Sequence, residues 1–181
     1  MMSKIQLSTG ILLLSAMAVA AQPPQSAGIL EFGPDNTLFV ADTLTGAIHA
    51  YDLPAEGPAP EQDVAYNLLD VDLSVTNALG AQGRLIYGDL AVHPVTRDAY
   101  VSVMATVDGV ATLAVVSITR QGDVTTLDLS TLPSTRFDLS DPGDPNVTFW
   151  RDIPAPTLTI TDLDFMNDDL FVSGVSTKAR K

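Results

Sequence analysis

The chain has 181 residues and no cysteine, and its 22 aspartates and glutamates outnumber 9 lysines and arginines, so that the formal net charge is −13. The lack of cysteine excludes a disulfide framework, a thiolate nucleophile and a cysteine-ligated metal site. Away from the two ends the basic residues are a few scattered arginines, too sparse to neutralise a phosphate backbone, and we therefore expect no nucleic-acid partner.

The N-terminal segment has the pattern of a secretory signal peptide. Lys4 precedes an apolar run over residues 11–21, and Ala18 and Ala20 supply small side chains at the spacing that signal peptidase accepts. The run is shorter than the roughly 20 residues that a helix needs to cross a bilayer, which disfavours stable membrane insertion after cleavage. We predict a secreted or periplasmic protein, and a retained membrane anchor is the alternative.

Short strands separated by turn residues follow the N-terminal segment. Residues 28–32 and 37–42 read as strands on either side of a turn that contains Pro34 and Asp35. Residues 47–53 form the next predicted strand, in which apolar and polar side chains occupy neighbouring positions. Three strands in a row predict an antiparallel meander.

The same order of strand, turn and strand recurs further along the chain. The predicted strands lie at residues 89–92, 99–104, 110–118, 124–129, 161–165 and 170–174. Asp108-Gly109, between two of them, is a strong hairpin signal. Three copies align on a short apolar motif and on an aromatic–valine pair after the turn: Leu30-Glu31-Phe32 with Phe39-Val40, Leu90-Ala91-Val92 with Tyr100-Val101, and Leu163-Asp164-Phe165 with Phe171-Val172. Such self-similarity predicts a repeat architecture.

Two proline-rich insertions, at residues 54–61 and 138–156, separate the copies and read as surface loops. Repeated proline removes backbone donors, so no central strand is expected to cross the second insertion. The predicted organisation is a signal peptide at residues 1–20, a flexible mature N-terminus at 21–27, a propeller-like β domain at 28–175 and a basic, disordered tail at 176–181.

The segment Leu38-Phe39-Val40-Ala41-Asp42, followed by Ala47-Ile48-His49-Ala50-Tyr51-Asp52, resembles the blades of NHL-type and gluconolactonase-like β-propellers. The resemblance implies an all-β fold of antiparallel four-stranded blades. A closed propeller has roughly four to eight blades, so the three copies predict an incomplete propeller of about three blades. A β-sandwich, which also has short strands at regular spacing, is the alternative. The resembling families include metal-dependent sugar-lactone hydrolases, quinone-dependent dehydrogenases and binding scaffolds.

Three aspartates, Asp89, Asp162 and Asp164, are candidate metal ligands, and calcium is the metal that their oxygens suit. Asp162 and Asp164 alternate along one predicted strand and therefore share a face. Asp89 precedes Leu90 as Asp162 precedes Leu163, so these residues could line the mouth of a channel. The alternative is that acidic residues at strand starts and turns cap backbone donors.

The leading function hypothesis is a non-enzymatic binding scaffold for a protein or small-molecule ligand, or a fragment of a longer propeller, whose open sheet edges would allow self-association. The alternative is a partial or degenerate metal-dependent, lactonase-like hydrolase, which requires carboxylates such as Asp42, Asp89 and Asp162 to converge. No catalytic or cofactor-binding residue is assigned. The two histidines, His49 and His93, are expected to serve the structure.

Overall fold

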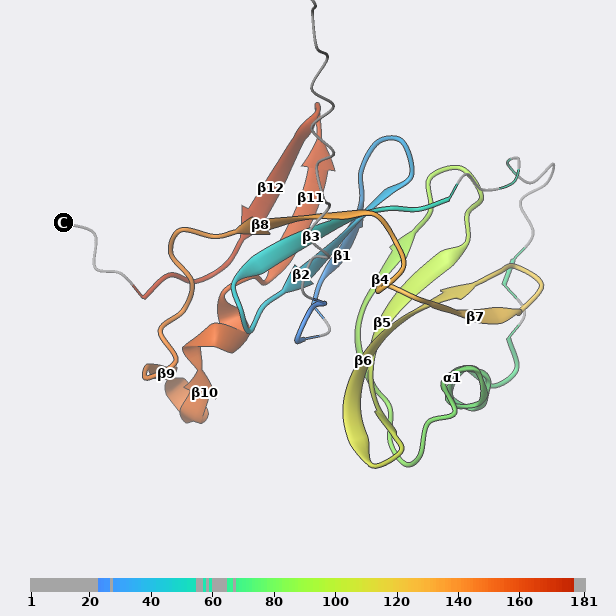
Figure 1. Cartoon of the computed structure of the whole chain (residues 1–181), viewed down its shortest axis with the longest axis horizontal. Helices are drawn as coiled ribbons and strands as arrows, with labels where there is room; N and C mark the ends of the chain where they lie inside the picture. Colours follow the sequence, from blue (N-terminus) through green and yellow to red (C-terminus); the bar gives the residue numbers. More distant parts are fainter. Residues whose placement is uncertain are drawn as a thin grey trace, which may run out of the picture.

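The computed structural model describes residues 23–26, 28–54, 57, 59, 65–66 and 68–177. These residues form four antiparallel sheets, one α-helix and two short 3-10 helices, and none of the sheets closes on itself (Figure 1). The expectation of an all-β fold is therefore confirmed at the level of the sheets. The predicted signal peptide lies outside the described residues, as does the tail beyond Thr177.

The first sheet has the strand order β1-β2-β3-β8. Its strands are β1 (Leu30–Phe32), β2 (Thr37–Asp42), β3 (Ala47–Asp52) and β8 (Ser134–Asp138). The first three form the predicted meander, because the turn at Asp35 and Asn36 takes up the positive φ angles of a tight hairpin, 53° and 62°. The fourth strand comes from far along the chain and pairs with β3, which no local pattern indicated.

The second sheet is a consecutive meander with the order β4-β5-β6-β7. Its strands are β4 (Ile86–Val92), β5 (Ala99–Val107), β6 (Val110–Ile118) and β7 (Val124–Leu127). Asp108 and Gly109 have φ angles of 50° and 80°, which confirms the predicted hairpin turn. β4 begins before the predicted strand because a register shift between Tyr87 and Leu90 extends its pairing with β5.

The C-terminal part contains two small hairpins. β9 (Thr148–Phe149) and β10 (Ile153–Pro154) are joined by the 3-10 helix η1 (Trp150–Asp152), and η2 (Ala155–Leu158) follows. No longer strand crosses the proline-rich insertion, as expected. β11 (Asp162–Met166) and β12 (Asp169–Ser173) then form a separate two-stranded sheet, the terminal hairpin. The third predicted copy is thus a hairpin and not a four-stranded blade in the described chain.

Helix α1 (Val71–Leu79) was not predicted, although its ends carry ordinary capping residues. The Asp70 carboxylate accepts the N–H of Leu73 at 2.9 Å, and Gly80 adopts φ 61°, ψ 28°, the left-handed conformation that ends many helices. Its buried residue Val75 packs against the second sheet.

The sheets stack in layers, with the first sheet between the terminal hairpin and the second sheet, and with α1 on the far side of the second sheet (Figure 1). The cluster between the first and second sheets includes Leu38, Tyr51 and Tyr100. A smaller cluster, with Ile48 and Leu163, lies between the first sheet and the terminal hairpin.

Candidate functional site

The first strands of the three hairpins lie side by side, with β1 between β4 and β11. Their carboxylates gather here: the charges of Asp164, Asp89 and Asp162 all act on Glu31 of β1. All three predicted metal ligands therefore lie within electrostatic range of Glu31, a residue that no sequence pattern had singled out. It lies between the buried residues Leu30 and Phe32 of a short strand, and this position carried no signal of its own.

Asp89 uses its carboxylate to join two sheets. Its Oδ2 atom accepts the backbone N–H of Leu30, on the edge of β1, at 3.0 Å. The N–H of Asp89 donates to Ser102 Oγ at 2.8 Å, and that hydroxyl donates to the carbonyl of Gly28 at 2.9 Å. A Cβ at Gly28 would lie 1.6 Å from the Ala41 carbonyl oxygen, so only glycine allows this approach. The capping role that was the alternative for Asp89 is observed directly.

Glu31 makes the corresponding link to the terminal hairpin. Its carboxylate accepts the backbone N–H of Phe165 in β11. Burial raises the pKa of Glu31 above its usual value, and the charges of Asp164 and Asp89 raise it further, while the hydrogen bond from Phe165 opposes the shift.

Asp162 and Asp164 are exposed on the face of β11 that points away from the first sheet, since Leu163 between them is buried against that sheet. Among the described residues no three histidines, aspartates or glutamates are arranged to hold a metal ion. The calcium site at Asp89, Asp162 and Asp164 therefore stays a prediction.

Asp42 does not join this group. It is fully buried, and its carboxylate accepts hydrogen bonds from the Gln25 N–H at 2.9 Å, the Ser26 hydroxyl at 2.8 Å and the Thr45 hydroxyl at 2.7 Å. Burial alone would raise its pKa, but these hydrogen bonds to the ionised form outweigh burial and hold the pKa of Asp42 below its usual value. The carboxylate anchors the N-terminal segment to the first sheet.

Both histidines are fully buried. His93 Nδ1 accepts the N–H groups of Val95 and Thr96, so the ring proton is on Nε2, which donates to Asn36 Oδ1 at 3.1 Å. His93 thereby ties the β4–β5 turn to the β1–β2 turn. His49 stacks on Tyr51 and has no hydrogen-bond partner among the described residues; burial, and then the charge of Arg136, lower its pKa.

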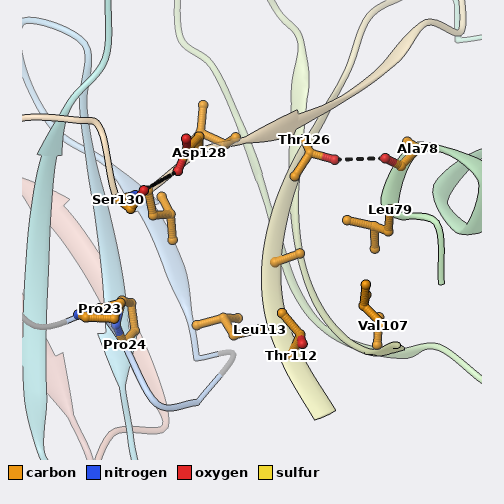
Figure 2. Close-up of a pocket in the computed structure, with 14 residues that line it drawn as sticks. Pro23, Pro24, Ala78, Leu79, Val107, Thr112, Leu113, Thr126, Asp128 and Ser130 are labelled. Atoms are coloured by element: carbon orange, nitrogen blue, oxygen red, sulfur yellow. Dashed lines mark hydrogen bonds between the residues drawn. The ribbon is translucent and has the colours of Figure 1, made fainter. Parts of the chain in front are cut away.

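A groove of about 510 Å³ runs along the free part of β6 (Figure 2). β6 pairs with β5 over its whole length but with β7 only from Val115 to Ile118, so residues 110–114 have one edge without a partner among the described residues. The groove occupies the place where a longer β7 would lie. Its lining is mostly apolar.

The β6 backbone separates the groove into two sides. Leu113 points toward Pro23 and Pro24 of the N-terminal segment on one side (Figure 2). Val107 and Leu79, from β5 and α1, lie on the other side. The Thr126 hydroxyl donates to the Ala78 carbonyl at 3.3 Å and holds α1 beside β7. A strand laid along β6 would thus meet apolar surface with both of its alternating sets of side chains.

A second groove, of about 710 Å³, lies over the outer face of the second sheet beside β4. α1 covers this sheet near β7 (Figure 1), and the groove lies on the β4 side. The Tyr87 hydroxyl donates to Asp72 Oδ1 at 2.6 Å and connects β4 to the helix. Burial and this hydrogen bond raise the pKa of Tyr87 to about 12.

Comparisons of the chain with protein-family models, with curated proteins and with solved structures found no match. In the part of the chain that the structure describes, no helix has the length and apolar character needed to cross a membrane. Function is therefore inferred from the geometry of the grooves and sheet faces.

Proposed function

We propose that this protein is a non-enzymatic binding protein that takes up an extended polypeptide segment by strand addition along β6. One observation carries the proposal: within the described part of the chain the edge of β6 at residues 110–114 is unpaired, and its residues 112–114 line an apolar groove. An exposed sheet edge presents a row of backbone donors and acceptors that another chain can satisfy.

The backbone pairing identifies the groups that would bind the ligand. Val107 and Val110 close the two-residue turn, so the N–H groups of Val110, Thr112 and Ala114 point toward β5. Those of Ala111 and Leu113 point to the open edge. An added strand would donate to and accept from these two residues and would continue the line of β7.

The ligand is an apolar strand with basic ends. Both sides of the groove are apolar, so successive side chains of the ligand are valine, isoleucine, threonine or similar residues. The formal net charge of −13 attracts positive charge at the ends of such a segment over a distance of about 10 Å at moderate salt.

The wider setting that we propose is an exported scaffold of propeller-like repeats. Support comes from the resemblance of residues 38–52 to propeller blades and from the N-terminal signal pattern. The hydrolase alternative gains no support from Asp42 and Asp89, because their carboxylates are engaged by backbone and hydroxyl donors.

The test is the binding of a fluorescent peptide of alternating valine and threonine with a lysine at each end, measured by anisotropy. Ala111→Pro removes an outward donor and leaves the β5 side of the ladder intact, so we expect the affinity to fall by about tenfold or more. Ala111→Val keeps the N–H and is the matched control.

A peptide N-methylated at the residues that face β6 is the second probe, and we expect it not to bind. Absence of binding to the folded wild-type protein would overturn the proposal, as would equal binding by Ala111→Pro and Ala111→Val. Circular dichroism on each variant shows that the comparison is made between folded proteins.

A further inference from the structure

The three hairpins β1–β2, β4–β5 and β11–β12 pair their strands in the same register. In each, the leucine of the aligned motif is opposite a valine, and the next residue is opposite an aromatic residue. The leucine–valine pairs are Leu30 with Val40, Leu90 with Val101 and Leu163 with Val172; the aromatic pairs are Glu31 with Phe39, Ala91 with Tyr100 and Asp164 with Phe171. Because side chains alternate, each hairpin has a leucine face and an opposite aromatic face.

The chain packs an aromatic face on a leucine face twice. The aromatic face of β4–β5 meets the leucine face of β1–β2, where the rings of Tyr100 and Phe32 lie 5.1 Å apart. The aromatic face of β1–β2 meets the leucine face of β11–β12, where the rings of Phe39 and Phe165 stack 6.0 Å apart. In both joints, therefore, the hairpin toward the second-sheet end of the stack supplies the aromatic face, and the hairpin toward the β12 end supplies the leucine face.

A carboxylate crosses each joint in the same direction as well. The hairpin that supplies the aromatic face also supplies the acceptor, and the hairpin that supplies the leucine face supplies an edge N–H. Asp89 accepts from Leu30 at the first joint, and Glu31 accepts from Phe165 at the second. The edge donors of β1 and β11 are thus satisfied by the neighbouring layer.

One face of each kind is left over at the two ends of the stack. The leucine face of β4–β5 is covered on its β5 side, where Ala99 and Val101 are buried, but is open on its β4 side. There it forms the floor of the groove of about 710 Å³, and Leu90 and Val92 are 56% and 45% exposed. The aromatic face of β11–β12 carries Phe171, which is 51% exposed, beside the exposed Asp164. The terminal hairpin and the second sheet lie at opposite ends of the stack of layers (Figure 1).

We propose that a second copy of this chain stacks head to tail on the first, with the aromatic face of its terminal hairpin on the leucine face beside β4. Phe171 would pack on Val92, as Phe39 packs on Phe165. Asp164 has the same place in the aligned motif as Glu31, and its carboxylate would accept an edge N–H of β4. Such an interface joins two different surfaces and so produces a ring where the rotation closes, or an open chain of subunits where it does not.

Exposed residues of opposite charge are available at the two end turns. At the first joint the β4–β5 turn contacts the β1–β2 turn through His93 and Asn36. At the proposed joint the β11–β12 turn, with the exposed Asp168, would take the corresponding place against the β4–β5 turn, which exposes Arg97. The stacking rests on the repeat proposed above and not on strand addition at β6, so the two proposals can fail separately.

The test is sedimentation velocity of the full chain over a wide range of concentration. We expect the wild-type protein to associate beyond a dimer, and Val92→Asp and Phe171→Asp each to stop self-association, because a buried charge without a partner is strongly unfavourable. Val110→Asp is the matched control, since Val110 is an exposed valine beside the β5–β6 turn, at the opposite end of the same sheet from Val92, and it should associate like the wild type.

The decisive sample is an equimolar mixture of Val92→Asp and Phe171→Asp. Each variant keeps the half of the joint that the other has lost, so the mixture should form a one-to-one dimer and nothing larger. A wild-type protein that stays monomeric at every concentration overturns the proposal, and so does a mixture that stays monomeric or variants that associate unchanged. Asp164→Asn, with intact packing surfaces, should weaken association about tenfold, and Asp108→Asn, at an exposed position of the β5–β6 turn outside the joint, should not.

Discussion

The first sheet and the terminal hairpin contain the same pairing register but differ in how much of it is buried. Leu38 and Val40 of the first sheet are completely inaccessible, because the second sheet covers one face and the hairpin covers the other. In the hairpin, Leu163 is buried but Phe171, on the opposite face, is half exposed.

The difference shows that the layers around a hairpin, and not its own pattern, decide what its carboxylates do. Asp42, in the first sheet, is buried and accepts hydrogen bonds from three residues. Asp164, in the hairpin, is exposed. Glu31 lies between the two sheets and has an intermediate environment, with partial burial and one backbone donor.

Truncation of a core leucine should separate the two regions most strongly. We expect Leu38→Ala to lower the free energy of unfolding by about 3 kcal/mol, because it leaves a cavity between two packed sheets. Leu170→Ala, at a partly buried position of the hairpin, should cost about 1 kcal/mol, since surrounding solvent fills part of the space. Urea unfolding followed by circular dichroism measures both, and equal losses would contradict the layered arrangement.

The two aspartates give the next largest contrast. Asp42→Ala leaves the part-buried donors of Gln25, Ser26 and Thr45 without an acceptor and should cost about 2 kcal/mol, whereas Asp164→Ala should leave the stability of the isolated chain nearly unchanged. Because the folded pKa of Asp42 is lowered, its contribution is fully present above the unfolded value of 3.8 and is lost as the pH falls through the folded pKa.

Unfolding measured at a series of acidic pH values checks this sign. The wild-type protein should lose stability relative to Asp42→Ala as the pH is lowered through that range. A difference between the two proteins that does not change with pH would show that the carboxylate acts only through packing.

Glu31→Gln should give the smallest change in the free energy of unfolding, and its dependence on pH should be opposite to that of Asp42→Ala. The folded pKa of Glu31 is raised, so the folded state holds the proton more tightly, and stability is lost as the pH rises from the unfolded value of 4.5 through the folded pKa. Glutamine keeps an acceptor for the Phe165 N–H without this charge. At neutral pH we expect the variant to be as stable as the wild type or more stable, by less than about 1 kcal/mol.

The comparison of the two proteins should be made across the interval just above pH 4.5. A loss of stability on Glu31→Gln at neutral pH would mean that the ionised carboxylate contributes more to the joint with Phe165 than its burial costs.

Turn residues and alternation were sufficient to predict most of the strands, because both act between residues that are close in the chain. Asp108-Gly109 prefers the positive φ angles of its hairpin wherever it occurs. Helix α1 was missed although Asp70 and Gly80 cap it, since its short apolar pattern resembled the strands around it. β8 had no local signature, because its pairing with β3 is made across more than eighty residues of chain.

Among the candidate site residues, the sequence indicated that Asp162 and Asp164 share a face and that Asp89 has a related place. It carried no sign of their common neighbour Glu31, or of the groove along β6, because a groove depends on where a neighbouring strand ends. Asp42 and Asp89 are both aspartates in predicted strands, and the sequence does not tell them apart. Only the structure shows that Asp42 accepts hydrogen bonds from Gln25, Ser26 and Thr45, whereas Asp89 links two sheets.

The sequence by itself determined the hairpins, their turns and the register in which leucine meets valine, since these follow from backbone preferences over a few residues. Only the tertiary structure decided that the first sheet lies in the middle, that carboxylates cross from layer to layer, and that two unlike faces are left open at the ends. Those features depend on which apolar surfaces meet, and burial is a property of the assembled layers and not of any one strand.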